Sequence, residues 1–120
     1  MSFILRMSGV IVGRSELETR DSARSIAHGA FRPGLGYELA EPVFMLFDQA
    51  AGDPDALARY RNARDALRLE LQDSSGSSVT VRDLHIRRDA DVARGASALT
   101  LEIETDDPLI WTATKPHSAR

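Results

Sequence analysis

The chain contains no cysteine, which excludes a disulfide scaffold and every site that needs a thiolate as ligand or nucleophile. It also lacks any run that approaches the roughly 20 apolar residues of a membrane span. The apolar N-terminus is interrupted by Arg6 and is followed by no cleavage site of small residues, so it does not predict a signal peptide. We therefore expect a cytoplasmic protein with no membrane partner.

Aromatic residues are scarce (6%), and 15 basic residues are outnumbered by 18 acidic ones, which gives a net charge of −3. No basic arm is present, and no aromatic side chain interleaves with the arginines at 82–88 as a base-stacking surface requires. We predict no nucleic-acid partner. The 120 residues, 42% of them hydrophobic, suit one compact α+β domain over residues 1–113, followed by a frayed tail at 114–120.

Five segments show the alternation of a half-buried strand. They are residues 3–13, 25–32, 67–72, 79–86 and 98–104. The apolar phase shifts at Ser8-Gly9 and again at Arg82-Asp83, which predicts a β-bulge at each place. The polar segment 13–24 between the first two strands predicts a long exposed connection.

Two segments carry helical signals instead. Apolar residues recur every three to four positions from Tyr37 to Ala51, which predicts a regular helix from about Glu41 to Gly52. Asp53-Pro54 predicts the capped start of a second helix that ends near Ala66. Short links between alternating strands favour an antiparallel arrangement. The predicted fold is therefore α+β, an antiparallel sheet of about five strands with two helices packed on one face.

No constellation of catalytic residues is complete. Of the three histidines, His117 lies in the predicted tail, and no Gly-x-Ser-x-Gly nucleophile elbow accompanies His28 or His85. The acidic residues at 16–21 lack the glycine and the alternating spacing of a calcium loop. We predict no metal, no cofactor and no catalytic residue, which favours a protein that is not an enzyme.

A pattern over residues 13–47 resembles one found in a group of small bacterial proteins. It comprises Gly-Arg-Ser-Glu-Leu-Glu at 13–18, Gly-Ala-Phe-Arg-Pro at 29–33, Tyr37, and Pro-Val-Phe at 42–44. Such proteins carry no established activity, so the resemblance implies no functional residue. Small acidic α+β proteins often include immunity proteins encoded beside bacterial toxins, which is an analogy of class.

Two kinds of function stay open. The first is a non-catalytic protein-interaction module, in its sharpest form an immunity protein that neutralises a toxin, with contacts by Glu16, Glu18, Asp21 and Arg24. The second is a small-molecule-binding or hydrolytic domain with a pocket between helix and sheet near His28, Tyr37 and His85. An uncovered edge strand would also allow the chain to form a homodimer.

Overall fold

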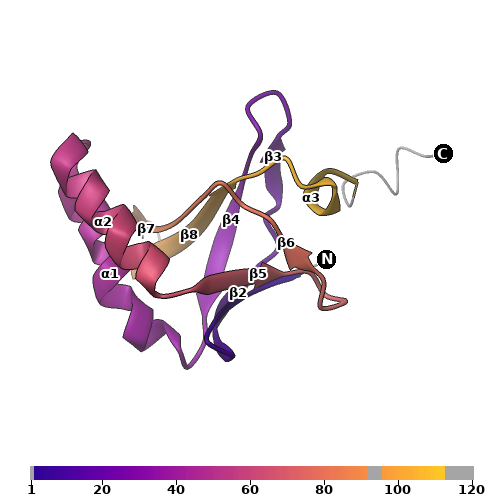
Figure 1. The fold of residues 1–120 in the computed structure, drawn as a ribbon, viewed down its shortest axis with the longest axis horizontal. Helices are drawn as coiled ribbons and strands as arrows, with labels where there is room; N and C mark the ends of the chain where they lie inside the picture. Colours follow the sequence, from indigo (N-terminus) through magenta and orange to yellow (C-terminus); the bar gives the residue numbers. More distant parts are fainter. Residues whose placement is uncertain (1, 92–95, 113–120) are drawn as a thin grey trace.

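The structure, a computed structural model, describes residues 2–91 and 96–112. Within these residues it contains eight strands and three helices, and Figure 1 shows their arrangement. The strands are β1 (Phe3–Met7), β2 (Val10–Ser15), β3 (Thr19–Asp21), β4 (Ile26–Pro33), β5 (Leu69–Gln72), β6 (Ser78–Val79), β7 (Asp83–Asp91) and β8 (Ala96–Glu104). The helices are α1 (Tyr37–Ala50), α2 (Pro54–Ala66) and α3 (Pro108–Thr112). The predicted α+β class is confirmed. The predicted tail at 114–120 lies outside the described residues.

Neighbouring strands all run antiparallel, in the order β6-β5-β1-β2-β4-β8-β7, with β3 also pairing with β4. The prediction of about five strands is too few. Two segments predicted as single strands are each divided in two, and the segment predicted as a loop contains β3. Residues from both ends of the strand order contribute to one hydrophobic core, so the sheet curves around it.

The predicted bulge at Ser8-Gly9 is wrong because the chain reverses there. Met7 pairs with Val10 across a two-residue turn, and both turn residues have positive φ angles of 51° and 84°. Such a turn matches the twist of the flanking strands. The irregularity of this hairpin lies between Leu5 and Arg6, opposite Val12. Val12 and Gly13 are consecutive buried residues, as expected where a bulge changes the phase of a strand.

The second predicted bulge, at Arg82-Asp83, is also wrong. The shift of phase marks the point where one strand has ended and another begins, since β6 ends at Val79 and β7 starts at Asp83. β6 pairs with β5, whereas β7 pairs with β8 at the other edge of the sheet. The segment between them therefore crosses from one edge to the other.

The polar segment 13–24, predicted as an exposed connection, is fixed to the rest of the fold by buried and hydrogen-bonded side chains. Leu17 is fully buried and adopts a positive φ of 45°, and its N–H donates to Ser15 Oγ at 3.1 Å. Arg20 donates to the carbonyls of Leu17 (2.9 Å) and Ile110 (2.5 Å) and lies over the Phe3 ring. This one guanidinium thus ties the segment to α3.

The two long helices form a hairpin beside the edge strand β7, at the opposite end of the molecule from α3 (Figure 1). α1 begins at Tyr37, four residues before the predicted start, whereas α2 has the predicted bounds. Asp53 caps α2, since its carboxylate accepts from the Ala56 N–H at 3.1 Å. No helix among the described residues is both long enough and apolar enough to cross a membrane.

Candidate binding site

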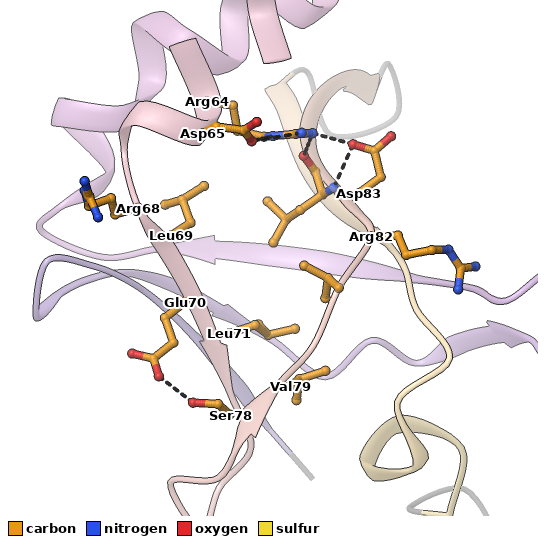
Figure 2. A pocket seen from close by; sticks show the side chains of 12 residues that line it. Arg64, Asp65, Arg68, Leu69, Glu70, Leu71, Ser78, Val79, Arg82 and Asp83 are labelled. Carbon is orange, nitrogen blue, oxygen red and sulfur yellow. Dashed lines mark hydrogen bonds and ion pairs between the residues drawn. The ribbon is translucent and has the colours of Figure 1, made fainter. Parts of the chain in front are cut away.

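A pocket of about 380 Å³ lies between β5 and the segment that leads from β6 into β7. Its apolar lining comprises Leu69, Leu71, Val79, Val81 and Leu84. Leu69 and Leu71 point into it, whereas Arg68 and Glu70 point the other way, as alternation along a strand requires (Figure 2). We call this pocket the seam pocket, because the two edges of the curved sheet approach each other there.

The seam pocket exists because the chain turns away from β5 directly after Val79, the last residue of β6. Thr80 donates its N–H to Asp107 Oδ2 at 2.7 Å and accepts from the Thr105 hydroxyl. Arg82 donates its N–H to the Glu104 carbonyl at 2.7 Å. These bonds commit residues 80–82 to the β8 side, so β6 pairs with only the last two residues of β5.

Arg64 of α2 lies at one end of the seam pocket and carries the main polar contacts there (Figure 2). Its side chain is only 10% exposed; it forms an ion pair with Asp83 and donates to the Leu84 carbonyl at 3.0 Å. Burial lowers the pKa of Arg64, but the hydrogen bond and charge of Asp83 outweigh it, so the net pKa is raised. Burial likewise opposes ionisation of Asp83, yet Arg64 and His85 hold the pKa of this carboxyl below its ordinary value. Both groups are therefore charged near neutral pH.

A second polar group lies on the outer side of β7 and fixes the helices to that strand. Tyr60 is fully buried, and its hydroxyl lies 3.0 Å from both the Leu84 carbonyl and Nδ1 of His85. His85 Nε2 is 3.1 Å from Asp83 Oδ2, and its ring stacks on Phe47 at 4.2 Å. Both ring nitrogens of His85 are thus engaged by the protein.

The hydroxyl of Tyr60 has one proton, so it can donate either to the Leu84 carbonyl or to His85 Nδ1. When His85 is neutral, Nε2–H donates to Asp83, Nδ1 accepts from Tyr60, and the Leu84 carbonyl still receives its bond from Arg64. Burial lowers the pKa of His85, and the charge of Asp83 only partly opposes this effect. The neutral arrangement therefore prevails near neutral pH, and it fastens α2 to the otherwise open edge of β7.

The three residues predicted to share a pocket are placed differently. His85 lines a hollow of about 80 Å³ together with Asp83 and Glu102. Neither His28 nor Tyr37 is among the described residues that line this hollow. His28 lies on β4, opposite Glu102 in the register with β8. Tyr37 is buried against the ring of Phe31 at 5.7 Å. The structure therefore separates Tyr37 from the two histidines, whereas His28 and His85 both lie opposite Glu102, on the two strands that flank β8.

The four residues predicted as partner contacts are exposed but divide into two pairs. Glu16 and Glu18 line a hollow of about 190 Å³, and Glu18 accepts a bond from the Ala30 N–H at 3.1 Å. Asp21 and Arg24 form the turn between β3 and β4 and bond to each other. Glu18 and Asp21 therefore have structural roles.

Sequence analysis did not identify the seam pocket, although one signal for it was present. The change of phase at Arg82-Asp83 indicates that the apolar residues before and after it belong to two different strands, β6 and β7. The sequence pattern instead predicts one continuous strand over residues 79–86. Among the described residues, no group of three or more histidine, aspartate or glutamate side chains is placed to hold a metal ion.

Comparison with models of protein families, with curated proteins and with solved structures finds no significant match. The resemblance to small bacterial proteins accordingly stays a prediction, and the site has to be interpreted from its own geometry.

Proposed function

We propose that the protein is a non-catalytic interaction module that binds an extended segment of a partner protein along β5, with an apolar side chain in the seam pocket. The observation that carries this proposal is the coincidence of a pocket with an aliphatic lining and a stretch of β5 that no strand pairs on the side away from β1. An exposed strand edge is a template for pairing with another chain, and adjacent pockets then give specificity.

The backbone of β5 supports this mode of binding. The Asp73 N–H donates to the Ser77 carbonyl at 2.9 Å, so the backbone groups of Leu71 and Leu69 point to the same side of the strand. Leu71 pairs with Val79, but the ladder ends there, since the two strands pair only at residues 71–72 and 78–79. The N–H and carbonyl of Leu69 are therefore available to an added strand.

The side chains around β5 specify the partner segment further. A strand added beside Leu69 directs alternate side chains to the two faces of the sheet. One face is the seam pocket, lined by aliphatic residues; the other carries Arg68, which is exposed and has no partner among the described residues. Glu70 on that face is already bonded to Ser78. The segment we expect places an aliphatic or aromatic residue next to an acidic one.

A displayed library of random peptides tests this proposal, with the purified chain as bait. We expect enrichment of peptides in which an apolar residue stands beside aspartate or glutamate. Leu69→Glu should weaken binding of a selected peptide at least about tenfold, because it places a charge at the mouth of the pocket. Arg68→Glu should shift selection towards basic residues at the neighbouring position. Arg32→Glu on β4, also exposed and without a partner among the described residues, is the matched control and should have no effect.

Amide hydrogen exchange supplies the second measurement. Bound peptide should slow exchange at Leu69, because its N–H gains a hydrogen-bond partner. The proposal fails if no peptide is enriched, or if a selected peptide binds the Leu69→Glu variant as tightly as the Arg32→Glu control.

A small apolar molecule is a second candidate ligand, since a volume of about 380 Å³ falls in the range of small-molecule sites. The two candidates differ in what they do to β5. A small molecule would shift the methyl resonances of Leu71 and Val79 and leave exchange at Leu69 unchanged, whereas a peptide would alter both.

The most specific partner we propose is a protein toxin, by the analogy of small acidic α+β chains with immunity proteins. Isolation of the protein with its bound partners from its native cells tests this identity. Recovery of a toxin that binds wild-type protein but not the Leu69→Glu variant would support an immunity role. Recovery of a toxin that binds both equally would separate that role from the seam pocket.

A further inference from the structure

The outer face of α1 carries exposed large apolar side chains, which the described residues of α2 and α3 do not. Leu35, two residues before the start of the helix, is 96% exposed, and Leu39, Met45 and Leu46 are 67%, 42% and 40% exposed. Phe44, on the opposite face, is buried in the core. Contiguous apolar surface of this kind marks interaction sites in soluble proteins.

Helical spacing aligns two of these leucines with Pro42 in one stripe. Leu39, Pro42 and Leu46 are separated by three and four positions, so they lie one above another on the helix. At its C-terminal end the stripe runs into a hollow of about 300 Å³ between α1 and α2, lined by Leu46, Gln49, Ala50, Ala56 and Arg59. The face thus carries projecting leucines at one end and a hollow at the other.

We propose that this face is the interface of a two-fold homodimer in which the α1 helices of the two copies pack antiparallel. A two-fold axis across the middle of α1 places the N-terminal half of each helix against the C-terminal half of its partner. Leu39 of each copy then enters the hollow of the other. Leu39 and Leu46 are seven residues apart, which is roughly 10 Å along the helix and allows both contacts to form together.

The charges at the two ends of the stripe favour this arrangement. Glu38 precedes Leu39, and Arg59 lies at the rim of the hollow; each has no partner among the described residues. Antiparallel packing brings each Glu38 towards an Arg59 of the other copy, so the opposite charges meet twice. A lipid surface fits less well, because the charged residues of α1 are all acidic and would be repelled by anionic headgroups.

The proposed dimer differs from one formed through the edges of the sheet. Arg64 occupies the Leu84 carbonyl on the edge of β7, and β6 at the other edge has only two residues. The α1 face lies away from the seam pocket and shares no lining residue with it. Dimerisation therefore leaves the proposed peptide site accessible.

Sedimentation equilibrium of the full chain over a range of concentrations tests this inference. We expect a monomer–dimer equilibrium in the wild-type protein. Leu39→Glu should weaken it by about a hundredfold, because the substitution occurs twice in the interface at about tenfold each. Thr19→Glu introduces the same charge at an exposed site on β3 and is the matched control. Circular dichroism establishes that each variant is folded.

Charge exchange tests the orientation of the two helices. Glu38→Arg and Arg59→Glu should each weaken the dimer, and the double exchange should restore it to within about threefold of wild type. A wild-type protein that is monomeric at every concentration overturns the proposal, and so does a dimer that Leu39→Glu weakens no more than Thr19→Glu. A double exchange that restores nothing overturns the antiparallel arrangement.

Discussion

Replacing Tyr60 with phenylalanine removes one oxygen atom from the contact between α2 and β7 and leaves the buried ring in place. The hydroxyl lies 3.0 Å from the Leu84 carbonyl and 3.0 Å from His85 Nδ1. The Leu84 carbonyl keeps its bond from Arg64, so the unpaired group left behind is the ring nitrogen of His85. Because no cavity forms, the cost is that of one buried hydrogen bond and its unpaired acceptor.

We expect Tyr60→Phe to lower the free energy of unfolding by about 1.5 kcal/mol, and Tm by roughly 5 °C for a domain of this size. Urea denaturation followed by circular dichroism measures the change, and the slope with urea should stay constant. Tyr37→Phe is the matched control, since Tyr37 is also buried but its hydroxyl bonds to no described residue. That variant should lie within about 0.5 kcal/mol of wild type.

The comparison of the two variants decides whether the hydroxyl of Tyr60 stabilises the fold. If Tyr60→Phe is as stable as Tyr37→Phe, the hydrogen bond of the Tyr60 hydroxyl contributes nothing to the stability of the fold. If it costs as much as Tyr60→Ala, for which we expect about 3–5 kcal/mol, the change has disrupted the core.

Three further predictions concern pH, a glycine and a helix cap. Burial lowers the pKa of His85 below its ordinary value of about 6.5, so the unfolded chain binds more protons in that range and stability should fall as pH drops through it; His85→Gln should flatten the slope of unfolding free energy between about pH 5 and 7. An unchanged slope would contradict the burial of His85. Gly13→Ala places a Cβ closer than 3.0 Å to the Phe31 ring and to a backbone oxygen, so we expect a loss above about 3 kcal/mol in thermal unfolding; a change under 1 kcal/mol would refute the close packing. Asp53→Ala should cost about 1 kcal/mol by the same assay, whereas Asp53→Asn should preserve most of the stability as an alternative cap.

Local signals in the sequence determined the helices and the class of the fold. Asp53 and Pro54 specify the start of α2 by their own chemistry, since a carboxylate accepts from the free N–H groups and proline fits the first turn. Alternation located β5 and β8, because only a half-buried strand has a period of two. These signals act over a few residues, which is why sequence analysis detects them.

Shifts of apolar phase indicated a break but not its kind. A two-residue turn at Ser8-Gly9 and a bulge there have the same pattern of alternation, and only the pairing of Met7 with Val10 distinguishes them. The same ambiguity hid the crossing between β6 and β7. Its cause is distant in sequence, since the bonds that draw residues 80–82 away from β5 come from Glu104, Thr105 and Asp107.

The polar segment before β4 shows most clearly what tertiary structure decided. Composition predicts solvent exposure for residues 13–24, yet Leu17 is fully buried and Arg20 bonds to the carbonyl of Ile110, 90 residues away. The two candidate sites also depend on tertiary structure. The sequence contained Leu39 and Leu69 as apolar residues at ordinary spacing, but burial depends on which neighbours the chain places over them. Strand β6 ends before it reaches Leu69, and no described element covers Leu39, so the fold alone left these two positions uncovered.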